Sequence, residues 1–239
     1  MIFDSLECEH PDIPEASKLT TLYSYQIWPQ KQSMDGLPPD GGDKLKQSLL
    51  SDQTPKVLNV EQFPMYWGAK YDFDEKEKAR STHRALLDLA HRVAPGIRVG
   101  TYGMVAGLPS SFDSWHRDDV EHAIYALQYS RGEDGRFVSH GAVDASDFLV
   151  QPGYVRYHTD DPDWNRRRIR EALDLLLGMN KRIYVYVWHR ISGTESLLPL
   201  ETWKAVLDEV QAKGAHPVLW SRKDESWSNV EPYIKVITT

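Results

Sequence analysis

The sequence predicts an α/β fold, a small TIM-like (β/α) barrel with either seven strands or an incomplete ring. Short apolar, β-branched and aromatic runs alternate six or seven times with longer stretches of helical period, which implies parallel strands joined by right-handed crossovers. No strand leads into a Gly-x-Gly-x-x-Gly turn or a phosphate loop, so the pattern does not favour an open nucleotide-binding sheet. A chain of 239 residues fits one large α/β domain, and we expect residues 1–239 to form it.

The predicted strands are short, with about five to eight residues each. They are Leu22–Trp28, Lys56–Glu61, Ile97–Gly103, Phe148–Gln151, Arg182–His189, His216–Ser221 and, as a seventh candidate, Tyr233–Ile237. The predicted helices between them carry apolar stripes and lie near Lys44–Leu50, over Glu77–Val93, over Val120–Leu127, after Asp161-Pro162 and over Leu200–Val210. Asp161 reads as the N-cap of its helix, and Gly214 as the stop signal of the last one.

The charge balance limits the classes of partner that the protein is expected to bind. Lys and Arg number 28 against 35 Asp and Glu, a net charge of -7, which argues against nucleic acid and against an anionic membrane surface as partners. No apolar run reaches the roughly 20 residues that a membrane span needs. The N-terminus lacks the basic start and apolar core of a signal peptide. We therefore expect a protein that is cytoplasmic, or secreted with its leader absent from this chain.

The most informative stretch is Val57–Pro64, which reads Val-Leu-Asn-Val-Glu-Gln-Phe-Pro. Strand side chains alternate between faces, so Asn59 and Glu61 are expected to point into the barrel while Leu58 and Val60 face the helices. Polar groups on an inner face are costly to bury without a use. Partial burial at the barrel mouth would keep Glu61 protonated, as a general acid requires.

A structural role for Glu61 is the alternative to catalysis. In that case Glu61 pairs with a barrel arginine, for which the candidates are Arg98 and Arg182. Carboxylates at the ends of barrel strands are usually catalytic, which favours the functional role.

Aromatic residues gather at or just beyond the predicted strand ends. Sugar rings present apolar C–H faces that stack on aromatic rings, so such a group suits a carbohydrate site, whereas the alternative is core packing under loops. The group comprises Trp28, Tyr66, Trp67, Tyr102, Tyr154, Trp188 and Trp220.

The remaining polar residues give weaker signals. His158 and His189 match no strong metal-binding spacing, and Asp160 and Asp161 are explained by helix capping. Cys8 is the single cysteine, so an internal disulfide or a cysteine-rich metal site is excluded. We expect no metal and no cofactor.

Two patches of the sequence resemble hyaluronidase-type glycoside hydrolases. Leu58–Pro64, followed by Tyr66-Trp67, is similar to the Asp-x-Glu strand of that family and the Trp-rich, Pro-containing stretch after it. The segments Arg182–Arg190, Leu197–Glu201 and Gly214–Ser221 resemble the family's closing strand–helix–strand pattern, in which a tryptophan ends the last strand.

The resemblance implies a (β/α) barrel and a retaining, substrate-assisted mechanism, in which the 2-acetamido oxygen of the sugar attacks the anomeric carbon. Glu61 would protonate the leaving oxygen, Tyr186 or Tyr154 would hold the acetamido group, and Trp220 would form the floor of the sugar site. The family's aspartate, two residues before the glutamate, corresponds to Asn59 in this chain.

These observations predict a glycoside hydrolase acting on a polysaccharide or glycoconjugate, with N-acetylhexosamine-containing glycans as candidates and Glu61 as general acid. Because Asn59 replaces an aspartate, the alternative is a non-catalytic carbohydrate-binding barrel. A third hypothesis pairs Glu61 with a second carboxylate, Asp224 or Glu225. A metal-dependent deacetylase is a fourth.

Overall fold

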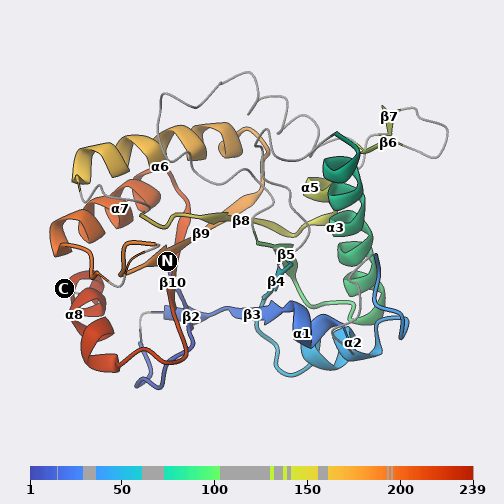
Figure 1. Ribbon diagram of the computed structural model, residues 1–239, viewed down its shortest axis with the longest axis horizontal. Helices are drawn as coiled ribbons and strands as arrows, with labels where there is room; N and C mark the ends of the chain where they lie inside the picture. The colour runs from blue at the N-terminus through green and yellow to red at the C-terminus, as the bar shows by residue number, and fades with distance from the viewer. Residues whose placement is uncertain are drawn as a thin grey trace. The chain divides into compact units, whose positions relative to one another are not determined.

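The computed structural model describes residues 1–14, 16–28, 36–60, 73–102, 130–131, 137–138, 141–155, 161–192, 194 and 196–238 (Figure 1). The chain forms two compact units. The first contains the described residues of Met1–Leu19 and Pro152–Thr239, and the second contains those of Thr20–Gly107 and His116–Gln151. Strands and helices alternate along most of the chain.

The first unit is built on parallel strands. These are β1 (Ile2–Leu6), β2 (Ala16–Lys18), β9 (Arg182–Trp188) and β10 (His216–Ser221), and they lie in the order β2-β1-β10-β9. The register sets Ser5 opposite Trp220, and Trp220 opposite Trp188. The N-terminal strand therefore pairs directly with the last strand of the chain.

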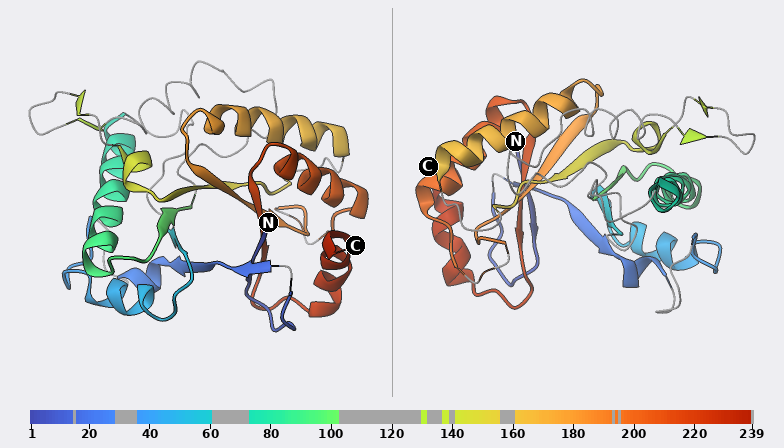
Figure 2. Two further views of the ribbon diagram at one scale, coloured as in Figure 1. Left: turned by 180° about the vertical axis from the view of Figure 1, so that it is seen from behind. Right: turned by 45° about the horizontal axis from the view of Figure 1, so that its top comes forward.

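The described helices of this unit are α6 (Pro162–Leu177), α7 (Leu200–Ala212) and α8 (Trp227–Thr238). α7 buries an apolar stripe that includes Trp203 and Val210, and the Trp203 indole N–H donates to the Tyr233 carbonyl oxygen of α8 at 3.0 Å. Arg170 of α6 binds Glu209 of α7 through two hydrogen bonds of 2.8 Å. The two views of Figure 2 show α7 and α8 on the same side of β10.

Strand β9 is buried on both faces after its first residue, as expected of a parallel strand covered by helices. Tyr184, Tyr186 and Trp188 point to one face, because strand side chains alternate. Tyr184 contacts the ring of Phe3 with a centroid distance of 4.7 Å and that of His216 with one of 5.7 Å. Aromatic side chains thus follow one another along this face of β9 up to the carboxyl end of the strand.

The second unit contains a parallel sheet in the order β3-β4-β5, formed by Thr20–Tyr23, Lys56–Asn59 and Val99–Thr101. A parallel bridge joins Tyr102 to Val150 of β8 (Phe148–Pro152), a strand whose residues up to Gln151 belong to this unit. Its other elements are α1 (Ser24–Ile27), α2 (Asp43–Leu49), α3 (Phe73–Val93), α5 (Ala142–Ala145) and the antiparallel pair β6 (Ser130–Arg131) and β7 (Phe137–Val138).

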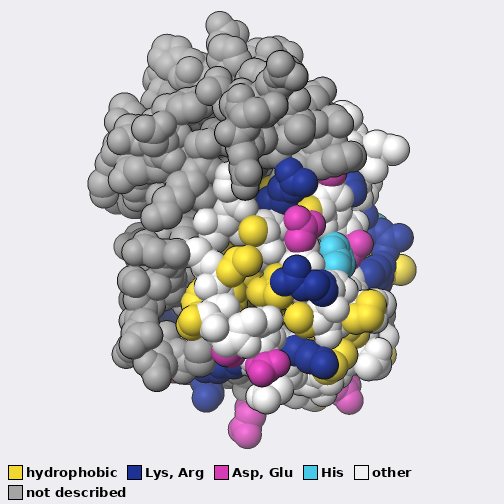
Figure 3. All heavy atoms as spheres, turned by 90° about the vertical axis from the view of Figure 1, so that its right-hand side faces the viewer, with side chains coloured by type: hydrophobic (Ala, Val, Ile, Leu, Met, Phe, Trp, Pro, Cys, Tyr) yellow, Lys and Arg dark blue, Asp and Glu magenta, His cyan; other side chains and the backbone are white. Residues whose placement is uncertain are grey.

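Gly100 lets β5 approach β8 closely. A Cβ atom at this position would lie 2.6 Å from the Phe148 carbonyl oxygen, so no larger residue fits without displacing backbone. In the described part of the face drawn in Figure 3, acidic, basic and apolar side chains are interspersed rather than gathered in a patch of one sign.

Most of the predicted elements are confirmed. The structure has β8, β9 and β10 at or within one residue of the predicted ranges, and β4 and β5 inside the predicted ranges. Helices α2, α3, α6 and α7 lie over the predicted helices. Asp161 caps α6 by accepting hydrogen bonds from the Asp163 and Trp164 amides at 2.9 and 3.2 Å. Gly214 follows α7 with a φ of 72°, a left-handed conformation that suits glycine. The helix predicted over Val120–Leu127 lies outside the described residues.

Two strand assignments are corrected. The range Leu22–Trp28 holds a strand only to Tyr23, after which Ser24–Ile27 turns into α1, with the Gln26 side chain accepting the Tyr23 amide at 3.0 Å. Tyr233–Ile237 is helical, because it lies within α8. Val230, Tyr233 and Ile234, at helical spacing, bury one face of that helix.

Strands β1, β2, β6 and β7 were not predicted, and of these β1 matters most for the site. Asp4 and Ser5 interrupt the apolar pattern of this segment, and both are nevertheless buried.

None of the described helices is both long and apolar enough to cross a membrane. The assignment of residues 1–239 to a single domain stays a prediction.

Candidate functional site

Three of the predicted aromatic residues form one cluster in the first unit. Trp188 ends β9, Trp220 lies one residue before the end of β10, and Tyr154 follows β8 by two residues. The ring centroids of Trp188 and Trp220 are 5.2 Å apart, those of Tyr154 and Trp220 5.6 Å, and those of Tyr154 and Trp188 6.1 Å. The cluster therefore lies at the carboxyl ends of parallel strands, where barrel proteins build their sites.

The cluster offers both apolar surface and polar groups. Tyr154 and Trp220 are half-buried, whereas Trp188 is 9% exposed. Among the described residues, the Trp188 indole nitrogen has no hydrogen-bond partner. The guanidinium carbon of Arg222 lies 5.9 Å from the Trp188 ring centroid, a cation–π contact.

The backbone around Tyr154 is held from two sides. Arg168 of α6 is fully buried and donates from Nη2 to the Tyr154 carbonyl oxygen at 2.6 Å. The Gly153 amide donates to the Tyr186 carbonyl oxygen at 2.7 Å, and a Cβ on Gly153 would lie 2.6 Å from the Val185 side chain. These contacts fix the position from which the Tyr154 ring reaches the cluster.

Glu7 joins the cluster although the sequence reading did not select it. Its carboxylate accepts the Trp220 indole N–H at 3.2 Å from Oε1. The Glu7 and Cys8 amides donate to Ser221 Oγ at 3.3 and 3.4 Å. The signal that could have revealed Glu7 is its place directly after a strand, but β1 itself was missed.

Tyr186 lies on the same face of β9 as Trp188, one step further from the carboxyl end. It is 1% exposed and stands opposite Val218 of β10. The structure thus places Tyr186 beneath the cluster, and Tyr154 at its surface.

Three other predicted residues lie in the second unit. Asn59 ends β4, is half-buried and stands opposite Tyr23 of β3. Trp28 is 4% exposed at the end of α1, where its carbonyl oxygen accepts a hydrogen bond from Lys44 Nζ at 3.0 Å. Tyr102 is 5% exposed and its amide donates to the Leu58 carbonyl oxygen at 3.0 Å. The described surroundings of Trp28 and Tyr102 are thus those of core residues.

Glu61, Tyr66 and Trp67 lie outside the described residues, as do His158 and Asp160. Of the arginines considered as partners of Glu61, Arg98 and Arg182 are both exposed. Arg182 begins β9, at the end of the strand away from the cluster.

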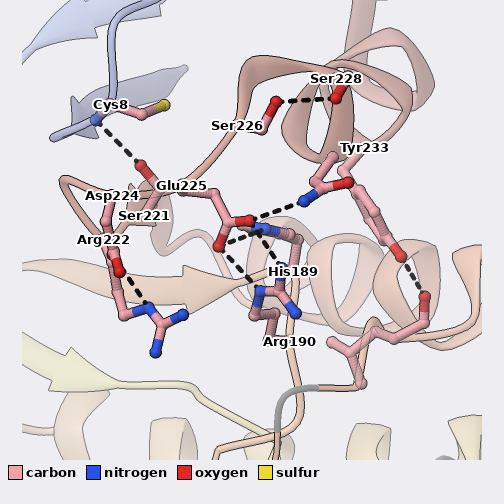
Figure 4. A network of polar contacts seen from close by, with 12 residues as sticks. Cys8, His189, Arg190, Ser221, Arg222, Asp224, Glu225, Ser226, Ser228 and Tyr233 are labelled. Carbon is pink, nitrogen blue, oxygen red and sulfur yellow. Dashed lines mark hydrogen bonds and ion pairs between the residues drawn. The ribbon is translucent and has the colours of Figure 1, made fainter.

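A second polar network lies on the helix side of β9 and β10 (Figure 4). Arg190 holds Glu225 through two hydrogen bonds, Nε to Oε2 at 2.8 Å and Nη2 to Oε1 at 2.7 Å. Asn229 donates to Glu225 at 3.1 Å, and His189 Nε2 lies 3.4 Å from the same carboxylate. The ring of His189 also packs against Tyr233 of α8, with a centroid distance of 5.4 Å.

The network perturbs the protonation of its members. Burial lowers the pKa of His189 to about 4, although the nearby Glu225 carboxylate opposes this shift. The hydrogen bonds from Arg190 lower the pKa of Glu225 to about 2. At neutral pH the network therefore contains a neutral imidazole beside a carboxylate–guanidinium pair.

These contacts favour a structural role for the network. Glu225 is engaged by Arg190 and Asn229, and Asp224 is exposed, with one oxygen 3.4 Å from Arg222 Nε. Neither carboxylate belongs to the aromatic cluster, so neither supports the two-carboxylate hypothesis. Within the described part of the chain, no group of three or more His, Cys, Asp or Glu side chains is arranged to hold a metal ion.

Comparison with protein-family models and with curated protein sequences finds no match. Comparison with solved structures does find similar folds. Bee venom hyaluronidase aligns with a TM-score of 0.66 and 12% sequence identity, covering 94% of this chain and 85% of that one. A broad-specificity endoglucanase from an uncultured bacterium and a β-1,4-mannanase of glycoside hydrolase family 113 align at TM-scores of 0.45 and 0.42, with 10% and 13% identity. They cover 90% and 92% of this chain, and 76% and 85% of their own chains.

The alignment with the bee enzyme extends over nearly the whole chain, so it concerns the fold as a whole rather than one motif. The described strands do not close into a ring, in agreement with the incomplete form of the expected barrel. The chain thus has a small TIM-like (β/α) fold of the kind found in bee venom hyaluronidase, and its resemblance to hyaluronidase-type glycoside hydrolases is distant in sequence.

Proposed function

We propose that this protein is a glycoside hydrolase acting on a polysaccharide or glycoconjugate that contains N-acetylhexosamine, and that Tyr154, Trp188 and Trp220 bind the sugar. The observation that carries the proposal is the aromatic cluster at the carboxyl ends of β8, β9 and β10, within a fold similar to that of a hyaluronidase. Its half-buried rings, Tyr154 and Trp220, offer faces on which the C–H groups of a sugar ring can stack.

In the proposed reaction, Glu61 donates a proton to the glycosidic oxygen while the sugar's own acetamido oxygen attacks the anomeric carbon. The bond between the anomeric carbon and the leaving oxygen breaks, and an oxazolinium ion forms. Water then attacks the anomeric carbon and gives a proton to Glu61, while the bond between the anomeric carbon and the acetamido oxygen breaks and the acetamido group is restored. Because each of the two displacements inverts the anomeric carbon, the product retains the anomeric configuration.

A tyrosine hydroxyl is proposed to hold the acetamido group. Of the two candidates, the half-buried Tyr154 has the better access to a ligand, because Tyr186 is only 1% exposed. The burial of Tyr186 suits a supporting position under the site.

A non-catalytic carbohydrate-binding barrel is the second candidate function. Asn59 favours it, because an asparagine can donate or accept a hydrogen bond but cannot supply the negative charge that stabilises an oxazolinium ion. The aromatic cluster is equally compatible with both functions, so only turnover separates them.

The deciding experiment measures both turnover and binding. Wild type, Glu61→Gln and the control Glu9→Gln, an exposed residue, are incubated with chitotetraose, hyaluronan and chondroitin, and new reducing ends are counted. Loss of the acid is expected to reduce turnover at least about 100-fold in Glu61→Gln, with Glu9→Gln unchanged.

The other outcomes are equally informative. Equal turnover by wild type and Glu61→Gln would remove Glu61 from the mechanism. Calorimetric binding without any product supports the carbohydrate-binding barrel. Neither binding nor turnover of any of the glycans would overturn both functions.

A further inference from the structure

Glu7 occupies a position at the aromatic cluster that the proposed reaction does not use. It follows β1 directly, and its carboxylate is the acceptor for the indole N–H of Trp220. The two residues are 213 positions apart in the chain and meet because β1 and β10 pair in parallel, with Ser5 opposite Trp220. Glu7 thus reaches the cluster from the end of a fourth strand, β1.

The strand ends around Glu7 are also tied through the backbone. The Glu7 and Cys8 amides both donate to Ser221 Oγ, and Ser221 is fully buried next to Trp220. These bonds fix the start of the Glu7 side chain relative to β10. The carboxylate therefore approaches the indole from an anchored backbone.

The hydrogen bond controls the orientation of the Trp220 ring. The indole N–H is the single polar group of a tryptophan side chain, and its bond to an ionised carboxylate is stronger than one between neutral groups. The half-buried Trp220 ring also makes aromatic contacts with Trp188, at an interplanar angle of 72°, and with Tyr154, at 35°. Aromatic contacts tolerate rotation and sliding, whereas a hydrogen bond fixes the direction of one ring edge.

The negative charge also affects the ring face. Hydrogen bonds polarise the groups that make them, so a carboxylate at the N–H edge adds electron density to the indole. The faces of an aromatic ring are already negative and attract positively polarised C–H groups. Both effects favour the stacking of a sugar ring.

We propose that Glu7 is a positioning residue for sugar binding, which acts by fixing and polarising the Trp220 indole. This inference rests on the proposed function, because it takes the ligand of the cluster to be a carbohydrate. Glu7 is not proposed to touch the reacting atoms.

The test compares Glu7→Gln, Glu7→Ala and the control Glu9→Ala, whose parent residue is exposed two positions away. Glutamine keeps an oxygen that can accept the indole N–H but removes the charge, whereas alanine removes the acceptor. Chemical denaturation first establishes that each variant is folded.

The first readout needs no ligand. Indole N–H signals are recorded by ¹⁵N–¹H NMR, and the Trp220 signal is identified by its loss in Trp220→Phe. In Glu7→Ala this signal is expected to shift and to exchange with D₂O at least about tenfold faster, because a charge-assisted hydrogen bond is gone. In Glu7→Gln it is expected to exchange at an intermediate rate, and in Glu9→Ala as in wild type.

The second readout is the Kd for chitotetraose and for a hyaluronan octasaccharide. Glu7→Ala is expected to weaken binding about tenfold and Glu7→Gln about threefold, with Glu9→Ala unchanged. An unchanged Trp220 signal in Glu7→Ala overturns the inference alone. An unchanged Kd in Glu7→Ala does the same. If wild type binds neither oligosaccharide, the proposed function is overturned, whatever the NMR signal shows.

Discussion

At the scale of single residues, the two polar groupings of the first unit differ in what surrounds them. The aromatic cluster contains the half-buried rings of Tyr154 and Trp220, and its polar groups include the Tyr154 hydroxyl, two indole N–H groups and the Glu7 carboxylate. The Glu225 network, in contrast, is buried between strand ends and α8, and its carboxylate accepts hydrogen bonds from Arg190 and Asn229. The first grouping suits binding, and the second suits the attachment of a helix.

Removing Arg190 is therefore predicted to affect stability. Arg190→Met leaves the Glu225 carboxylate buried with its main cationic partner gone, which is expected to cost about 3 kcal/mol in the free energy of unfolding. Urea denaturation measures the loss. Lys235→Met is the matched control, because its pair with Glu231 at 3.1 Å lies on the surface and is expected to contribute less than about 1 kcal/mol. Equal losses in the two variants would show that the buried pair is not structural.

At the scale of elements, capping and close packing determine where helices and strands can lie. The start of α6 combines an N-cap aspartate with proline in the first turn, both readable from the sequence. Helix α6 in turn carries Arg168, which holds the Tyr154 backbone. The cap thus contributes indirectly to the geometry of the aromatic cluster.

Asp161→Ala tests how much the cap stabilises the protein. The variant removes the acceptor of two amide groups and is expected to lower the free energy of unfolding by about 1 kcal/mol. Asp163→Ala is the control, since Asp163 lies in the same turn, is exposed and does not cap the helix. A larger loss for Asp163→Ala than for Asp161→Ala in thermal denaturation would contradict the assignment of the cap.

At the scale of the whole molecule, pH links the buried network to global stability. Burial lowers the pKa of His189 from 6.5 to about 4, so between these pH values the unfolded chain binds a proton that the folded chain does not. The free energy of unfolding therefore falls as the pH is lowered from 6.5 to 4. The lowered pKa of Glu225 extends the loss from pH 4.5 towards 2.

We predict a loss of up to about 3 kcal/mol from His189 over the upper window. Denaturant titrations at pH 7, 6, 5 and 4 measure it. His189→Gln does not titrate and is expected to show a smaller change over the same range, whatever its stability at pH 7. A pH dependence as steep in the variant as in wild type would exclude His189 as its source.

The local pattern of the sequence was sufficient for most of the elements and for part of the site. Strand β9 is apolar and aromatic after its first residue, and β10 is apolar and aromatic from Pro217 to Trp220. The helices carry caps and apolar stripes, so neighbouring residues alone identify these elements. For the same reason Tyr154, Trp188 and Trp220 could be recognised as residues at or just beyond strand ends. The failures are also local, because Tyr233–Ile237 has the β-branched content of a strand but the burial period of a helix.

The sequence by itself thus determined the α/β class, the β/α alternation and three aromatic members of the cluster, because short-range periodicity encodes these features. Only the tertiary structure decided that Glu7 meets Trp220, that Arg190 engages Glu225, and that Tyr186 lies beneath Tyr154 and Trp188. The first of these contacts depends on the pairing of the N-terminal strand with the last one. Such pairing is set by the packing of the whole unit, and the period of neighbouring side chains carries no record of it.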